Sequence, residues 1–160
     1  METVPKDPKG GLELNTELVK ELLVRFIRDE TQSAGFQKGV IGVSGGVDSA
    51  VSAYLTVEAL GKENTLGAIL PYKTGSPQSV KDAQLVIERL GIRSELVDIS
   101  EMVDAYCERW KVTDRVRRGN VMARVRMIVL YDVSARAPAL VVGTSNKTEL
   151  MVGYGTLYGD

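Results

Sequence analysis

The residue types best suited to chemistry gather in one short segment, Ser44-Gly45-Gly46-Val47-Asp48-Ser49-Ala50, which follows the apolar run 40–43. Glycines allow positive φ angles and a close approach of the backbone to a ligand. Where such a turn opens a helix, the first N–H groups and the positive end of the helix dipole favour an anion. The segment therefore predicts a phosphate-binding turn between a strand and a helix.

Three side chains of this segment strengthen that prediction. The hydroxyls of Ser44 and Ser49 can hydrogen-bond to phosphate, and Asp48 can hold a divalent ion against the phosphates. The segment lacks the lysine of the G-x-x-x-x-G-K-[ST] motif, so it differs from the phosphate loop of the common nucleoside triphosphatases. The alternative is a plain strand-turn-helix in which Asp48 only complements the helix dipole.

The composition narrows the chemistry further. The 160 residues include no histidine and one cysteine, which excludes Ser-His-Asp catalysis, His-ligated metals and internal disulfides within this chain. The net charge of −1 gives no bulk electrostatic reason to expect nucleic acid or a membrane surface as a partner. No apolar run has the length of a membrane span and residues 1–11 are polar, so a cytoplasmic enzyme is expected.

The hydrophobic pattern predicts strands that alternate with helices after a first helix that starts near Leu14. Ser76 and Pro77 predict the cap and first turn of one of these helices. Strands are expected over 38–43, 65–70, 92–98 and 139–143, and helices over 48–60, 77–90, 100–110 and 119–136.

Two of the helices carry specific expectations about burial. In the first helix, Leu18, Leu22 and Phe26 recur at helical spacing with Leu14, and they are expected to face the core. The polar side of this helix is expected to be wet, and it consists of Lys20, Glu21, Arg28 and Asp29. The helix 100–110 is expected to bury Val103, Tyr106 and Trp110, with Cys107 as a packing residue.

Strands alternating with helices predict the α/β class: a doubly wound parallel sheet with helices on both faces, a Rossmann-like three-layer sandwich. Ligands of such sheets bind beyond the carboxyl ends of the strands, where the strand order reverses. This rule brings Ser44–Ser49, Pro71–Ser76 and the segment after Gly143 to one crevice. A single domain over residues 1–160 is expected, incomplete at its C-terminus because only four strands are visible.

Two further segments place polar side chains near that crevice. Asn120 and Arg124 share a helix face, whereas Arg126 is rotated by about 200° from Arg124, so the two arginines cannot reach one ligand together. A solvated basic helix is the alternative. In the other segment, Glu149 is a candidate second carboxylate for a metal, but its spacing from Asn146 also fits a capping box.

Taken together, these stretches resemble the ammonia-dependent NAD synthetases, which are ATP pyrophosphatases with an adenine nucleotide alpha hydrolase-like fold. The resemblance extends from about Leu14 to the last residue. The stretches that carry it are Ser44–Ala50, Arg118–Val121, Ala123–Met127, Val142–Leu150 and Gly153–Asp160.

The resemblance implies a reaction: the nicotinate carboxylate of deamido-NAD attacks the α-phosphorus of ATP, pyrophosphate leaves, and ammonia displaces AMP to give NAD. Such chemistry needs positioning and charge neutralisation more than a protein nucleophile, so no catalytic residue is expected. By position, Arg124 would contact deamido-NAD, Asp48 and Glu149 would hold Mg²⁺, and family members are homodimers. The implied ATP contacts are Gly42, Val43, Ser44, Gly45, Gly46, Val47, Asp48, Ser49 and Thr144.

If Glu149 holds Mg²⁺ as the resemblance implies, capping is expected to be the lesser of its two roles. One residue departs from the family: Leu157 stands where many ammonia-dependent members carry a lysine that contacts the dinucleotide. Three alternatives remain. The chain could amidate or thiolate another substrate, it could bind ATP as a sensor without turnover, or it could have lost the amidase domain of a glutamine-dependent enzyme.

Overall fold

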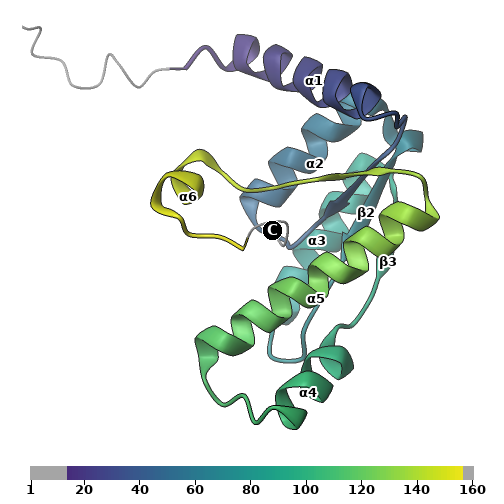
Figure 1. Ribbon diagram of the computed structural model, residues 1–160. Coiled ribbons are helices and arrows are strands. Elements are labelled where there is room, and N and C mark those ends of the chain that lie inside the picture. The colour runs from purple at the N-terminus through teal and green to yellow at the C-terminus, as the bar shows by residue number, and fades with distance from the viewer. Residues whose placement is uncertain (1–13, 157–160) are drawn as a thin grey trace, which may run out of the picture.

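A parallel β-sheet of four strands lies at the centre of the computed structural model, which describes residues 14–156 (Figure 1). The strands are β1 (Gly39–Gly42), β2 (Thr65–Ile69), β3 (Arg93–Leu96) and β4 (Leu140–Val142). The α-helices are α1 (Thr16–Ser33), α2 (Val47–Leu60), α3 (Pro77–Leu90), α4 (Ser100–Arg109), α5 (Arg115–Arg136) and α6 (Lys147–Val152), and a 3₁₀ turn, η1, covers Lys62–Asn64.

The strand order is β3-β2-β1-β4, and every pairing is parallel. The chain therefore builds outward from β1 through β2 to β3, and then returns to add β4 on the other side of β1. The strand order reverses between β1 and β4, which is where a doubly wound sheet binds ligands. The predicted fold class is confirmed.

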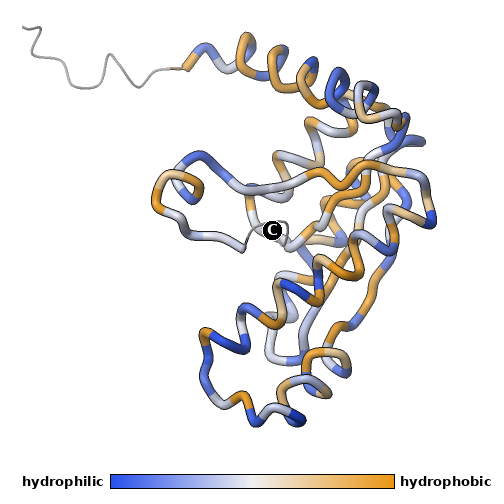
Figure 2. The backbone as a smooth tube through the Cα atoms, viewed as in Figure 1, coloured by the Kyte–Doolittle hydropathy of each residue, from blue (hydrophilic) through white to orange (hydrophobic). Residues whose placement is uncertain are grey.

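Both faces of the sheet are covered, because neighbouring residues of β1 point into different cores. Val40 packs in a cluster with Val103 of α4 and Val133 of α5, whereas Ile41 packs with Ala53 of α2 and Ala83 of α3. Alternate side chains of a strand point to opposite faces, so a strand buried on both faces needs a continuous apolar run. Figure 2 shows this hydrophobic centre between layers of mixed polarity.

The helix caps confirm the predicted start of α3 and move the start of α5 to an earlier residue than predicted. The Ser76 hydroxyl accepts a hydrogen bond from the N–H of Gln78, so α3 begins at Pro77 as predicted. Helix α5 begins four residues earlier than expected, because the Asp114 carboxylate accepts a hydrogen bond from the N–H of Arg117. This cap extends the helix to Arg115.

The expectation for the faces of α1 is wrong for its apolar side, whereas Glu21 and Asp29 are exposed as expected. This helix packs on α2 rather than on the sheet, and Leu22 remains 59% exposed. The inner face is partly polar: Lys20 pairs with Glu58 at 3.2 Å, and the Arg28 guanidinium donates to the Ala59 carbonyl at 3.0 Å. Helical spacing identifies an apolar stripe but does not say what that stripe contacts. The remaining exposed apolar side chains of this helix are Leu18, Leu23 and Phe26, and Leu14, which precedes the helix, is exposed as well.

The expectation for α4 is wrong in part. Val103 and Cys107 are buried, as predicted, but Tyr106 is 50% exposed and Trp110 is 62% exposed. Positions 103 and 107 are four apart and share the buried face, and position 106 is rotated by about 60° from 103. Trp110 follows the last residue of α4 as its C-cap, so the helical spacing does not place it. None of the described helices combines the length and the apolar character that a membrane span requires.

The two faces of α4 give a stability prediction. Val103→Ala should lower the free energy of unfolding by about 2 kcal/mol, since a fully buried side chain of this size is lost. Tyr106→Ala, a larger truncation on the same helix, should cost under about 1 kcal/mol. Urea denaturation followed by far-UV circular dichroism measures both; equal losses would contradict the assignment of the faces.

Candidate functional site

The backbone of the β1–α2 loop, residues 43–46, is shaped for close approach. Gly45 has a φ of +85°, which a residue with a side chain adopts at a cost. A Cβ on Gly45 would lie 2.3 Å from the Ser79 carbonyl oxygen, so the loop touches the start of α3 directly. Gly46 is the N-cap of α2 and brings no capping side chain to the first N–H groups of that helix. These groups suit an anion.

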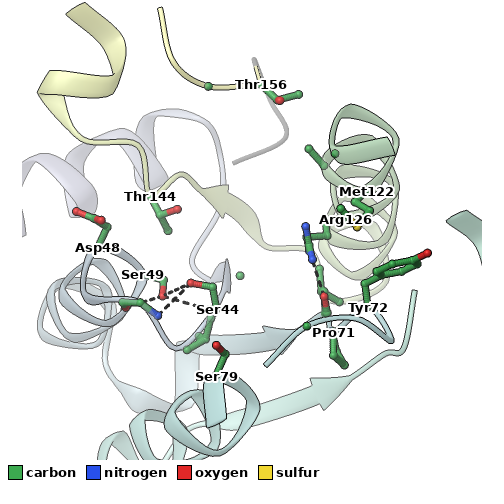
Figure 3. A pocket seen from close by; sticks show the side chains of 18 of the residues that line it. Ser44, Asp48, Ser49, Pro71, Tyr72, Ser79, Met122, Arg126, Thr144 and Thr156 are labelled. Carbon is green, nitrogen blue, oxygen red and sulfur yellow. Dashed lines mark hydrogen bonds between the residues drawn. The ribbon is translucent and has the colours of Figure 1, made fainter. Parts of the chain in front are cut away.

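The two serines hold the loop together. The N–H of Ser44 donates to the Ser49 hydroxyl at 3.1 Å, and that hydroxyl donates to the Gly46 carbonyl at 3.0 Å. The two hydroxyl oxygens are 3.0 Å apart, and the N–H of Gly46 donates to the Ser44 hydroxyl at 3.2 Å (Figure 3). Ser49 is buried whereas Ser44 is exposed. The structure therefore uses Ser49 to fix the loop and leaves Ser44 the better placed of the two for a ligand.

A cavity of about 970 Å³ opens at the carboxyl ends of β1, β2 and β4. It is lined by the β1–α2 loop, the β2–α3 loop (residues 70–76), one face of α5 and the segment 144–156. The structure thus brings the three predicted segments to one crevice. The predicted residues that line it are Gly42, Val43, Ser44, Gly46, Asp48, Ser49, Thr144 and Glu149. Gly45, Val47 and Arg124 do not line this cavity.

Asp48 and Glu149 bring carboxylates to the cavity from separate elements, α2 and α6. Asp48 is exposed in the first turn of α2, and Glu149 is half-buried. Among residues 14–156, no group of three or more acidic, Cys or His side chains could hold a metal. A pair of carboxylates that leaves other positions to phosphates and water suits Mg²⁺, which keeps several waters and prefers oxygen ligands.

Glu149 also caps α6, as its spacing from Asn146 allowed. The Asn146 side chain accepts from the N–H of Glu149 at 3.0 Å, and the Glu149 carboxylate accepts from the N–H of Asn146 at 2.9 Å. This reciprocal pair is a complete capping box. It uses Oε2 of Glu149, so a cation would be held by Oε1 or would replace this bond.

The cavity face of α5 carries a different arginine from the one that the resemblance selected. Asn120 and Arg126 line the cavity, whereas Arg124 is exposed on another side of the helix. The guanidinium of Arg126 donates to the Leu70 carbonyl at 3.1 Å, which ties α5 to the β2–α3 loop (Figure 3). The sequence separated the two arginines by rotation, but the orientation of the helix decides which one faces inward.

Two residues of the β2–α3 loop, Tyr72 and Lys73, form a polar cluster with Asp104 and Arg118. The sequence did not reveal this cluster. The Tyr72 hydroxyl donates to Asp104 at 2.8 Å and accepts from Arg118 at 2.9 Å, and Lys73 donates to the other Asp104 oxygen. Hydrogen bonds from Lys73 and then Tyr72 lower the pKa of Asp104, and Asp104 raises the pKa of Lys73. Because the folded-state pKa of Asp104 is lowered, its contribution to stability is present at neutral pH and is lost as the pH falls through that pKa.

The remaining residue singled out by sequence, Leu157, lies outside the described residues. Of the other cavity-lining side chains, Tyr72, Ser79 and Arg126 were not selected as site residues. The rule that ligands bind at the carboxyl ends of parallel strands placed the segment Pro71–Ser76, which contains Tyr72, at the crevice, but it did not select this side chain.

Comparison with known proteins places this site in a family context. The family model described as NAD synthase matches residues 19–160. An NH₃-dependent NAD⁺ synthetase of Chlorobium phaeovibrioides is 56% identical over 149 residues, which are 93% of this chain and 54% of the relative. The chain therefore spans about half the length of the curated relatives it matches.

Solved structures of related proteins share the fold. An NH₃-dependent NAD synthetase from Campylobacter jejuni, in complex with the nitrate ion, matches with a TM-score of 0.86 and 37% identity, over 92% of this chain and 64% of that one. An NMN synthetase from Francisella tularensis matches with a TM-score of 0.85 and 33% identity, over 92% of this chain and 61% of that one.

The contact between Gly45 and Ser79 gives a second prediction. Gly45→Ala should lower the free energy of unfolding by about 2 kcal/mol or more, because a positive φ and a backbone clash act together. Gly119→Ala is the control: its Cβ would meet no atom within 4 Å, and alanine favours the helix by about 1 kcal/mol. Thermal unfolding compares the two. A Gly45→Ala chain as stable as the wild type would refute the close approach.

Proposed function

The chain belongs to the NAD synthase family, and from this we propose that its cavity binds ATP and deamido-NAD for amidation by ammonia. The products are NAD, AMP and pyrophosphate, and the reaction passes through an adenylated intermediate. The observation that carries the proposal is the position of the Ser44–Ser49 segment, which includes Asp48, at the strand-order reversal. This segment and Glu149 line one cavity.

The β1–α2 loop is suited to the ATP side of this reaction. The proposed ATP contacts are Gly42 to Ser49, which lead from the end of β1 into the first turn of α2, and Thr144, which follows β4. Backbone N–H groups at a helix start stabilise negative charge without reorganising, and the hydrogen bonds of Ser49 hold them in place. The loop would therefore act by positioning the phosphates for in-line displacement.

We propose that Asp48 and Glu149 hold Mg²⁺. Such an ion neutralises the charge that develops on the departing pyrophosphate. Asp48 is exposed in the first turn of α2, and Glu149 offers the carboxylate oxygen that its cap does not use. A sensor that only bound ATP would have little need for two carboxylates here.

The reaction itself balances on the substrates. A carboxylate oxygen of the nicotinate group forms a bond to the α-phosphorus, and the bond to pyrophosphate breaks. Ammonia then attacks the carbonyl carbon, AMP leaves with the shared oxygen, and a proton passes to solvent. The chain orients these groups, so the proposal needs no nucleophilic residue. This agrees with a cavity lined by hydroxyls, two carboxylates and one arginine.

The likeness to the family supports further parts of the proposal. We propose a homodimer in the cytoplasm, and a single catalytic domain to which residues 1–160 contribute. Arg124 is proposed to contact deamido-NAD from outside the cavity, which its exposed position on α5 permits. In a dimer whose dinucleotide site lies near the interface, an exposed arginine beside the cavity would have such a role.

A second candidate product is NMN, favoured by the likeness to the Francisella structure. The identity to the curated NH₃-dependent NAD⁺ synthetase is higher, 56% against 33%, so the dinucleotide is preferred. Supplying the deamido form of each nucleotide separately, with Mg-ATP and ammonium, distinguishes the two by which substrate drives AMP release.

Product analysis by mass spectrometry tests the proposed reaction. The chain with Mg-ATP, deamido-NAD and ammonium should form NAD and AMP in equal amounts, and only when deamido-NAD is present. Asp48→Asn should lower this turnover by about 100-fold or more, because several kcal/mol of charge stabilisation are removed.

The matched control is Asp29→Asn, an equivalent change on α1 outside the cavity, which should leave turnover unchanged. Circular dichroism should show that both variants fold. Full turnover by Asp48→Asn would refute the metal role, and AMP release without NAD would refute the substrate.

The two arginines of α5 give a separate prediction. Arg124→Ala should lower the affinity for deamido-NAD by about 30- to 150-fold, because a charged hydrogen-bond pair worth about 2–3 kcal/mol is lost. The affinity for ATP should be nearly unchanged. Arg126→Ala should instead lower the affinity for ATP, since Arg126 ties α5 to the β2–α3 loop. Titration calorimetry with each ligand measures both; equal losses for both ligands in Arg124→Ala would mean that its role is misassigned.

A further inference from the structure

Tyr72 connects the nucleotide cavity to charged groups that lie outside it. Its side chain is 5% exposed and lines the cavity, whereas Lys73, Asp104 and Arg118 do not. The Tyr72 hydroxyl donates to Oδ1 of Asp104 at 2.8 Å and accepts from Arg118 at 2.9 Å. A buried hydroxyl that is bonded in both directions to ionised groups has its orientation set by them.

These contacts join three elements that are far apart in sequence. Asp104 lies on α4, Arg118 lies in the first turns of α5, and Tyr72 and Lys73 belong to the β2–α3 loop. Arg118 uses its other terminal nitrogen to donate to the Val112 carbonyl at 3.1 Å, between α4 and α5. Its planar fork thus bridges the loop and the α4–α5 turn, which a lysine could not do.

The rest of the β2–α3 loop is held from the same side. The N–H of Ile99 donates to the Pro71 carbonyl at 3.0 Å, and the N–H of Lys73 donates to the Ser100 hydroxyl at 2.9 Å. Within the loop, the N–H of Gly75 donates to the Tyr72 carbonyl at 2.7 Å. The position of Tyr72 therefore sets the turn that leads into α3.

The start of α3 in turn bears on the β1–α2 loop, because the Ser79 carbonyl lies where a side chain on Gly45 would be. A displacement of the β2–α3 loop would be passed through packed backbone to the residues that surround the first turn of α2. Packed interiors transmit such shifts because they leave few voids.

We propose that Asp104 and Arg118 are positioning residues which, through Tyr72, hold the β2–α3 loop as a fixed wall of the nucleotide cavity. Neither residue lines the cavity. The inference rests on the proposed function for the identity of the ligand, but the fixed loop is a property of the chain itself. Losing the unit should loosen ATP binding while leaving the chemical step nearly unchanged.

The test uses Tyr72→Phe, Asp104→Asn and the double variant, with two readouts. Hydrogen exchange of the amides of residues 70–76, measured without nucleotide, should become faster in each single variant. The dissociation constant for Mg-ATP, measured by titration calorimetry, should rise about tenfold in each, as expected when hydrogen bonds that fix a wall are lost. The double variant should be no worse than the single ones, since the residues act as one unit.

Glu95→Gln is the matched control. It weakens an ion pair of similar kind, between Glu95 and Arg136, whose residues do not line the nucleotide cavity. It should change neither loop exchange nor ATP affinity. Arg118→Lys keeps the charge and should behave like Asp104→Asn, because it cannot bond Tyr72 and Val112 together.

Unchanged loop exchange and ATP affinity in the single variants would overturn the positioning role, as would additive losses in the double variant. In active enzyme, the KM for ATP should rise in the single variants while kcat stays within about twofold. An equal rise of KM in Glu95→Gln would point to lost stability alone and would also overturn the positioning role. A wild-type chain that binds ATP but forms no NAD would overturn the proposed reaction, and the shifts in exchange and affinity would still support the positioning role.

Discussion

The structure depends on the double burial of β1. This strand pairs in parallel with β2 on one side and with β4 on the other, and Val40 and Ile41 are fully buried against opposite helix layers. A ligand can reach a central strand of this kind at its carboxyl end, where the connections that follow its two neighbours turn in opposite directions. The gap between them is the cavity. Gly46 lines it, and the positive φ of Gly45 allows the backbone to turn sharply there to start α2.

Much of this arrangement could be predicted from sequence, because its causes are local. A continuous apolar run predicts β1, the Ser76-Pro77 pair predicts the start of α3, and alternating elements predict a parallel sheet. The orientation of surface helices could not be predicted in the same way. The leucines of α1 form a stripe at helical spacing, yet Lys20 and Arg28 face α2 because Glu58 and the Ala59 carbonyl offer partners there. Periodicity identifies faces, and tertiary contacts decide which face is covered.

The residues of the candidate site likewise fall into those that local motifs predict and those that only tertiary contacts place. The β1–α2 loop, Asp48 and Glu149 were found because each belongs to a short motif, and the resemblance to a family supplied their proposed roles. The capping box of Glu149 was visible as a spacing, but the balance between cap and ligand was not. The cluster around Tyr72 had no sequence signal, since its members are 32 and 46 residues apart. Arg126 rather than Arg124 faces the cavity because the packing of Val125 and Val129 sets the rotation of α5.

The exposed position of Trp110 has an optical consequence. It is the only tryptophan of the chain, and its indole is 62% exposed just beyond α4, four residues before the Asp114 cap of α5. Its emission in the folded protein should already be close to that of an indole in water, so the spectrum would shift little on unfolding. The same fluorophore lies next to the α4–α5 turn, where a quencher in solution can reach it. Its fluorescence therefore reports whatever comes to cover that turn, rather than the integrity of the core.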